Sequence, residues 1–243
     1  MRLSIVLLAL SLHTAVAADL TMMIGDNPPF NSFHKDKAQG MAVDIVDEML
    51  KRAGLTAQYP VYPWARLFNL AQSEANHCAY TVGRLPEREA MFQWIGPIAF
   101  NQWAFFALRE RNIKLNSLDD ARKYTVAGQR KDAKATWLEG RGFQIDYATE
   151  ERQALLKLMA KRIDLYPVGL FSADDIAKRH QIDPKLLQPV LVFNRVENYL
   201  VCSPSTDAKF IAKLQQALVS IKADKTLQKI WDKYEAEFEK PAN

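Results

Sequence analysis

The chain has 243 residues, of which 49% are hydrophobic and 25% are charged, a composition typical of a globular protein. The formal net charge is only +4 at pH 7, and no run of lysine and arginine and no stripe of aromatic and basic residues occurs, so nucleic acid is excluded as a partner. His34, His77 and His180 are far apart and lack metal-ligand spacing, so we expect neither a metal nor another cofactor.

The first 17 residues have the features of a secretory signal peptide. Arg2 gives a basic start, residues 5–10 form an apolar core, and Ala15-Val-Ala17 provides a small-residue cleavage site. The apolar part is too short to span a membrane. We therefore expect a signal peptide at 1–17, cleavage after Ala17, and a soluble mature protein in the periplasm.

Strands and helices alternate through the rest of the chain. The expected strands cover 20–24, 57–62, 78–82, 103–108, 124–127, 143–147, 165–168, 190–193 and 199–202. The expected helices cover 42–52, 64–72, a short segment capped by Ser117, 133–139, 150–161, 172–179, 207–222 and 225–238. Strands separated by helical segments imply βαβ units and mostly parallel sheets. Two successive sets of such units predict an α/β protein of two lobes joined by two crossovers.

Two arginines in the segment after residues 78–82 are candidates for binding an anionic ligand. That apolar run has the length of a buried strand, and Arg84 and Arg88 follow its carboxyl end, where ligands bind in open α/β sheets. Arginine presents a planar fork of donors that matches a carboxylate or phosphate, so both are candidate anion clamps. The alternative is a solvated pair with Glu87 or Glu89 on a surface turn, and spacing alone slightly favours that alternative.

Two cysteines, Cys78 and Cys202, enter an oxidising compartment if the chain is exported. Both lie in apolar runs expected to be strands. The sequence leaves two possibilities open, a disulfide or two buried free thiols that pack as small hydrophobic residues.

Three motifs resemble one protein family. A Pro-Pro-Phe loop precedes Gly40-Met-Ala-Val-Asp-Ile, Arg84-Leu-Pro-Glu-Arg88 follows, and Phe92-Gln-Trp-Ile-Gly-Pro97 comes next. In order and spacing these resemble the bacterial extracellular solute-binding proteins of family 3, the amino-acid-type receptors of ABC importers, over 19–238. The resemblance implies a type 2 periplasmic binding fold, with lobe 1 at 18–106 and 196–243 and lobe 2 at 107–195. It also implies that the strands of Cys78 and Cys202 are neighbours, which favours a disulfide.

The resemblance implies a ligand site between the lobes. By this likeness Arg88 holds the ligand's carboxylate, and the turn at 128–132 supplies further donors in lobe 2. We also expect Arg84 and Arg66 to be secondary donors. The remaining expected ligand-binding residues are hydroxyl-bearing, aromatic or part of that turn: Tyr80, Thr81, Phe30, Trp64, Trp103, Gln129 and Arg130. Gly169 stands where the family has an acidic residue for the α-amino group, so this chain departs from the pattern for a standard amino acid.

These features predict a monomeric periplasmic receptor without catalytic residues. It would bind a small polar, carboxylate-bearing, amino-acid-like solute and deliver it to an ABC permease in the inner membrane. One alternative is a periplasmic enzyme of the dehydratase type on the same fold, with Glu87, Glu89 or His77 as acid or base. Another is a ligand-sensing protein that is not linked to transport.

Overall fold

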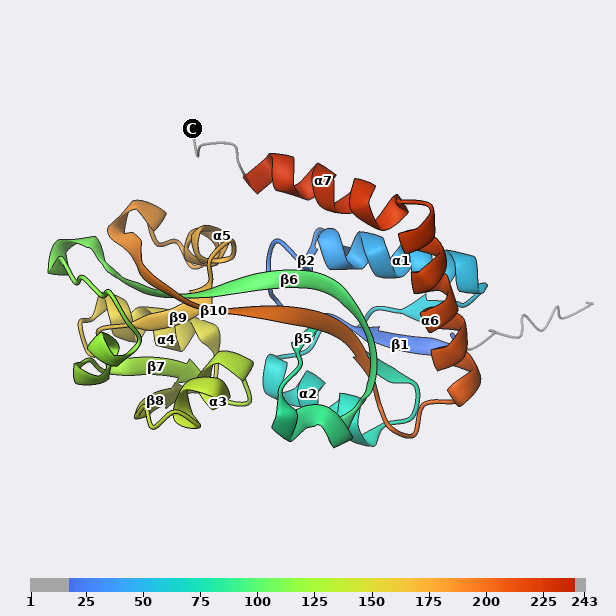
Figure 1. Ribbon diagram of the computed structural model, residues 1–243, viewed down its shortest axis with the longest axis horizontal. Coiled ribbons are helices and arrows are strands. Elements are labelled where there is room, and N and C mark those ends of the chain that lie inside the picture. The colour runs from blue at the N-terminus through green and yellow to red at the C-terminus, as the bar shows by residue number, and fades with distance from the viewer. Residues whose placement is uncertain (1–17, 239–243) are drawn as a thin grey trace, which may run out of the picture.

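The computed structural model describes residues 18–238, so the expected signal peptide at 1–17 lies outside the described residues. Two α/β lobes lie side by side and are joined by two long strands, β6 (Gln93–Leu108) and β10 (Leu187–Cys202) (Figure 1). These strands pair antiparallel from end to end, so the chain crosses between the lobes twice within one ribbon. The predicted two-lobed α/β fold is confirmed.

A six-stranded sheet runs through both lobes. In spatial order its strands are β4 (Ala57–Gln58), β1 (Leu20–Met23), β5 (His77–Gly83), β10, β6 and β9 (Tyr166–Gly169). The first three are parallel, and the crossover strands and β9 pair antiparallel. The second lobe adds the parallel pair β7 (Val126–Gln129) and β8 (Ile145–Ala148), and the first lobe adds the hairpin β2 (Ser32–His34) and β3 (Lys37–Gln39).

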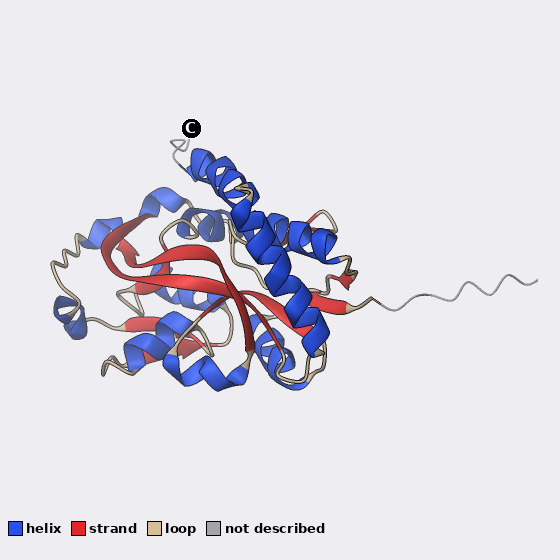
Figure 2. Ribbon diagram, turned by 45° about the vertical axis from the view of Figure 1, so that its right-hand side comes forward, coloured by secondary structure: helices blue, strands red, loops and turns tan. Residues whose placement is uncertain are grey.

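Helices lie on both sides of the strands (Figure 2). The first lobe carries α1 (Met41–Ala53), α2 (Trp64–Ser73), α6 (Ala208–Ala223) and α7 (Thr226–Phe238). The second lobe carries α3 (Ala133–Glu139), α4 (Glu151–Met159) and α5 (Ala173–Arg179). The 3-10 turns are η1 (Pro86–Met91), η2 (Arg109–Arg111), η3 (Asp119–Lys123) and η4 (Pro184–Leu186). Within residues 18–238, no helix has both the length and the apolar character that a bilayer crossing requires.

Each lobe has its own hydrophobic core. The largest buried cluster of the first lobe draws on 20–99 and returns to the same lobe at 200–227. Two clusters in the second lobe use only residues between 104 and 187. A small cluster of Leu85, Trp103, Ala133 and Val196 is the apolar contact between the lobes. Separate cores with a small shared contact are the packing that permits hinge motion.

The structure differs from the sequence-based elements at the crossovers. The strands expected at 190–193 and 199–202 are one continuous strand, because the polar residues between them lie where β10 passes from lobe to lobe and is partly exposed. The strand expected at 103–108 likewise extends back to Gln93. The strand expected at 57–62 is reduced to two residues and a single bridge between Ile24 and Val61.

Cys78 and Cys202 form a disulfide. They lie directly opposite each other in the antiparallel pair of β5 and β10, with Cα atoms 4.0 Å apart, and both are fully buried. The bond ties the crossover strand to the first lobe across a sequence separation of 124 residues.

Candidate functional site

A cavity of about 430 Å³ lies between the lobes, and we call it the interlobe cavity. The first lobe lines it with the loop after β1, the start of α2, the end of β5 and both crossover strands, and the second lobe with the segments around α3, α4 and α5. The lining residues are Gly25, Asp26, Asn27, Asn31, Val61, Tyr62, Pro63, Trp64, Thr81, Gly83, Arg88, Asn101, Trp103, Gln129, Asp132, Ala133, Lys134, Glu150, Glu151, Arg152, His180 and Asn198.

Arg88 is the buried cation of this cavity. Its side chain comes from η1 and is only 3% exposed, and its guanidinium lies over the ring of Phe68 at 4.9 Å. Nη2 donates to the Lys131 carbonyl of the second lobe at 2.8 Å, while the buried Nη1 has no hydrogen-bond partner within the described part of the chain. Burial lowers the pKa of this guanidinium below its usual value. A buried donor without a partner is costly, so Nη1 indicates a place for an acceptor from a ligand.

Thr81 lies at a β-bulge of β5 and lines the cavity. Tyr80 and Thr81 together oppose one residue of β10, and Thr81 has a φ of 49°, which is rare for a β-branched residue. The Thr81 hydroxyl donates to Asn31 Oδ1 at 2.6 Å and accepts from Asn27 Nδ2 at 3.1 Å. Strained backbone of this kind concentrates at functional sites. Thr81 lines the cavity, whereas the neighbouring Tyr80 packs in the core of the first lobe.

Asn101 fills the place next to Gly169. A Cβ atom at position 169 would lie 2.8 Å from Asn101 Nδ2 and 3.0 Å from Oδ1, so a larger residue there would displace the amide. Asn101 is 6% exposed, and its Oδ1 has no hydrogen-bond partner among the described residues. This crossover strand therefore offers a neutral acceptor beside the position where the family pattern has an acidic residue.

In the turn at 128–132, the amide of Arg130 donates to the Ala148 carbonyl and the amide of Asp132 donates to the Gln129 carbonyl, each at 3.1 Å. Asp132 is the N-cap of α3, and its carboxylate accepts from the amides of Lys134 at 2.8 Å and Ala135 at 3.3 Å. The same carboxylate forms an ion pair with Lys134 Nζ at 2.9 Å. The amides of Lys134 and Ala135 at the start of α3 are therefore already satisfied by the Asp132 side chain.

Arg84 lies away from the interlobe cavity. It forms an exposed ion pair with Glu89 and lies over the rings of Tyr199 at 5.1 Å and Trp94 at 5.3 Å. The surface pair that the sequence left as an alternative for both arginines therefore holds for Arg84, whereas Arg88 is buried.

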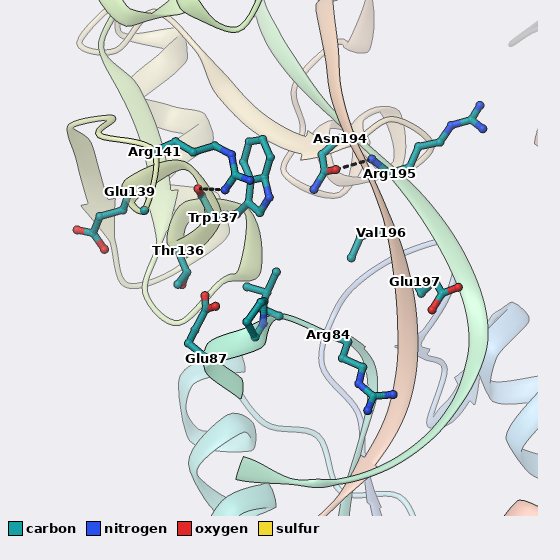
Figure 3. A pocket seen from close by; sticks show the side chains of 13 residues that line it. Arg84, Glu87, Thr136, Trp137, Glu139, Arg141, Asn194, Arg195, Val196 and Glu197 are labelled. Atoms are coloured by element: carbon teal, nitrogen blue, oxygen red, sulfur yellow. Dashed lines mark hydrogen bonds between the residues drawn. The ribbon is translucent and has the colours of Figure 1, made fainter. Parts of the chain in front are cut away.

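Arg84 lines a second cavity of about 810 Å³, which shares no residue with the interlobe cavity (Figure 3). We call it the Arg84 groove; its lining residues are Arg84, Leu85, Pro86, Glu87, Thr136, Trp137, Glu139, Gly140, Arg141, Asn194, Arg195, Val196 and Glu197. Within residues 18–238, no buried polar side-chain atom without a partner belongs to this groove. Arg88 and Asn101 carry such atoms in the interlobe cavity, which makes the smaller cavity the better candidate site.

Four other predicted residues lie outside the cavity lining. Tyr80 and Phe30 are each 1% exposed and pack in the core of the first lobe. Arg66 lies over the ring of Tyr62 at 4.5 Å, and Arg130 lies over the ring of Tyr147 at 5.7 Å. Of the predicted set, the structure gathers Arg88, Thr81, Trp64, Trp103 and Gln129 around the cavity.

Several contacts hold the lobes together around the cavity. The Lys131 carbonyl accepts from Trp64 Nε1 at 3.1 Å as well as from Arg88. The Lys131 side chain donates to Asn69, and Arg179 of α5 forms an ion pair with Asp26. These contacts connect lobe 2 to lobe 1 directly, so the described conformation is a closed one.

A two-lobed α/β fold with a polar cavity between the lobes provides space for a small solute. The sequence matches the family model of the bacterial extracellular solute-binding proteins, family 3, over residues 20–237, and the chain belongs to this family. No group of three or more His, Cys, Asp or Glu side chains within residues 18–238 is arranged to hold a metal ion.

Solved structures share the fold at low sequence identity. A histidine kinase sensor domain with similarity to periplasmic binding proteins is 19% identical, with a TM-score of 0.78 over 88% of this chain and 94% of that chain. The arginine-, lysine-, histidine-binding protein ArtJ from Geobacillus stearothermophilus is 19% identical, with a TM-score of 0.75 over 88% and 93%. An arginine transport system periplasmic binding protein from Legionella pneumophila is 17% identical, with a TM-score of 0.73 over 90% and 100%. No curated protein matches the sequence.

Proposed function

We propose that this protein is a monomeric periplasmic receptor that binds one small polar solute through a carboxylate in the interlobe cavity. The observation that supports this most strongly is the buried Arg88 guanidinium, whose Nη1 atom lacks a hydrogen-bond partner within the described part of the chain. A carboxylate would satisfy this donor and neutralise the buried charge, and charge-assisted bonds of this kind are among the strongest available to a small ligand. Thr81 and Trp64 would contact the same solute from lobe 1.

The three residues that the sequence offers as acid or base for a dehydratase lie outside the interlobe cavity. Glu89 is held by Arg84, and Nδ1 of His77 lies 2.9 Å from the Ala75 carbonyl oxygen. Glu87 lines the Arg84 groove. None of these three lines the interlobe cavity, so the acid or base proposed for a dehydratase would not reach a solute bound there.

Delivery to an ABC permease is the second part of the proposal. A solute that contacts both lobes would favour the closed state by its differential affinity, and closure would present a surface that the permease distinguishes from the open form. Uptake of the labelled solute by cells with and without the gene tests this step. Uptake that does not depend on the gene, together with intact binding, would favour a sensing role.

Calorimetric titration with matched solutes tests the binding step. A panel of small carboxylic acids is compared with the corresponding carboxamides, which keep the size but lose the charge. We expect at least one acid to bind. Its amide should bind about tenfold more weakly or worse, a loss of about 1.4 kcal/mol or more, because the amide lacks the charge that pairs with Arg88. Equal affinity for acid and amide would contradict a carboxylate contact.

A further inference from the structure

Neutral polar side chains form one continuous part of the lining of the interlobe cavity. We call this part the amide wall; its members are Asn27, Asn31, Thr81, Asn101 and Asn198. Apart from Asn27, each of these residues is buried, with between 2% and 7% of its surface exposed. Buried polar side chains normally have hydrogen-bond partners, so any partner that the protein does not supply is expected from the solute.

Hydrogen bonds hold three members of the wall in place. The Thr81 hydroxyl donates to Asn31 and accepts from Asn27, and Asn31 Nδ2 donates to the Gly25 carbonyl at 2.7 Å. Ser172 of lobe 2 extends this chain of contacts, since its Oγ lies 3.5 Å from Asn27 Oδ1. Every group in the chain is uncharged.

Asn101 and Asn198 continue the wall on the two crossover strands. Asn101 pairs with Val196, which is two residues from Asn198, so both amides lie on the same face of the ribbon. Asn101 also approaches Ser172, because a Cβ atom at Gly169 would lie no more than 3.0 Å from either side chain. Asn101 Oδ1 has no hydrogen-bond partner in the described part of the chain, so this acceptor requires a donor from the solute.

The carboxylates that line the same cavity are paired, exposed or readily protonated. Asp26 and Asp132 each form an ion pair with a cation of lobe 2. Glu150 is exposed, as is Arg152 beside it. Desolvation raises the pKa of the Glu151 carboxyl to about 7, so about half of it carries a proton at neutral pH. Among the lining residues that the structure describes, none of these carboxylates is a buried and fully ionised partner for an ammonium group.

We propose that the solute is a hydroxy acid without an ammonium group, whose hydroxyl groups bind the amide wall while Arg88 binds its carboxylate. This inference rests on the proposed function, because it assumes that a carboxylate occupies the interlobe cavity beside Arg88. A hydroxyl both donates and accepts, as a carboxamide does, so the two form hydrogen bonds without burying a second charge. An ammonium group in the same place would be desolvated against neutral side chains, which is costly without a carboxylate partner.

Matched solutes test the class of ligand. The probes are glycolate, L-lactate, L-glycerate and D-gluconate, each beside the corresponding 2-amino acid and the acid that has hydrogen in place of the 2-substituent. In calorimetric titrations we expect at least one hydroxy acid to bind. Both of its counterparts should bind about tenfold more weakly or worse, since a site that hydrogen-bonds a hydroxyl discriminates against compounds that lack it.

Asn101→Asp is the sharpest variant, because it places a carboxylate in the wall with almost no change in size. The ratio of the affinities for the hydroxy and the amino compound should fall by about tenfold or more, since the new carboxylate would pair with the ammonium group. Asn194→Asp is the matched control: it adds the same charge to the same ribbon, but Asn194 lines the Arg84 groove, so the ratio should change by less than about twofold. An unchanged ratio in a folded Asn101→Asp protein would overturn the inference. If this variant does not fold, the wild-type panel decides the question.

The outcomes separate this inference from the proposed function. If an amino compound binds more tightly than its hydroxy counterpart and Arg88→Ala abolishes that binding, the hydroxy-acid inference is wrong and the carboxylate site stands. If Arg88→Ala binds the best probe as tightly as the wild type does, the proposed function itself fails. When no probe binds, the solute released from protein purified out of the periplasm is identified by mass spectrometry. A solute that carries a basic nitrogen or lacks a hydroxyl group overturns the inference, and the absence of any solute counts against both proposals.

Discussion

Removing the Arg88 guanidinium should weaken solute binding far more than removing the neighbouring Arg84. Arg88 is 3% exposed, so an anion bound to it is almost completely desolvated. In Arg88→Ala that anion would remain in the cavity without its partner, and truncation of one member of a buried charge pair costs about 2–5 kcal/mol. Since Nη2 already donates to the Lys131 carbonyl, Nη1 supplies the free bond, and we take about 3 kcal/mol as the expected loss. This corresponds to an affinity more than about a hundredfold lower.

Two further variants sharpen this measurement. Arg88→Lys keeps the charge, but an ammonium group lacks the planar arrangement of donors that lets Arg88 bind the solute and the Lys131 carbonyl at once. This variant should therefore recover only part of the affinity. Arg84→Ala is the matched control, because Arg84 forms an exposed pair with Glu89 outside the cavity. Arg84 does not line the interlobe cavity, so its removal should change solute affinity by less than about twofold, as expected for a distant site. Isothermal titration calorimetry gives the affinities, and circular dichroism verifies the fold of each variant.

A loss of less than about fivefold in a folded Arg88→Ala protein would refute the role assigned to Arg88. A larger loss in Arg84→Ala than in Arg88→Ala would move the site to the Arg84 groove.

Three more predictions concern closure, stability and pH. Arg179→Ala removes the ion pair with Asp26 that links the lobes, so small-angle scattering should give a larger radius of gyration without solute. Replacing both Cys78 and Cys202 with alanine should lower the free energy of unfolding by about 2–4 kcal/mol in denaturant titrations, because the bond closes a long loop. Burial raises the pKa of Glu151 from 4.5 to about 7, so the folded state retains a proton that the unfolded chain has lost between those values. Stability should therefore fall as the pH rises through this window, and Glu151→Gln should reduce the fall.

Each of these predictions has a contrary result. An unchanged radius in Arg179→Ala would show that the other contacts hold the closed form alone. Equal unfolding free energies with and without the cysteines would mean that the disulfide does not constrain the unfolded chain. Parallel pH profiles for the wild type and Glu151→Gln between about pH 4.5 and pH 7 would mean that Glu151 keeps an ordinary pKa.

The two-lobed fold could be predicted because its signals are local. The alternation of apolar runs and helical stripes reports the βαβ units, and the segment from Arg84 to Pro97 keeps the family's order and spacing. The crossover strand β10 was harder to predict, because its middle residues are polar. A strand that passes between lobes is partly solvent-exposed, so it lacks the apolar run by which buried strands are identified.

The site was only partly predictable, because side-chain direction depends on tertiary structure. Thr81 lies at a bulge in β5 with a φ of 49°, and no local sequence pattern marks that bulge. Asn101 and Glu151 were missed since each lies in a segment with an ordinary role, a strand and the first turn of a helix. The one signal in the sequence was Gly169 itself. A glycine in the place of the family's acidic residue indicates that other side chains line this part of the cavity.

A crystal structure of the protein with its bound solute would show whether Arg88 binds the carboxylate. We expect electron density for one solute in the interlobe cavity, with a carboxylate oxygen within hydrogen-bond distance of Arg88 Nη1 and the lobes closed around it. A solute found in the Arg84 groove, or one in the interlobe cavity that makes no contact with Arg88, would contradict it.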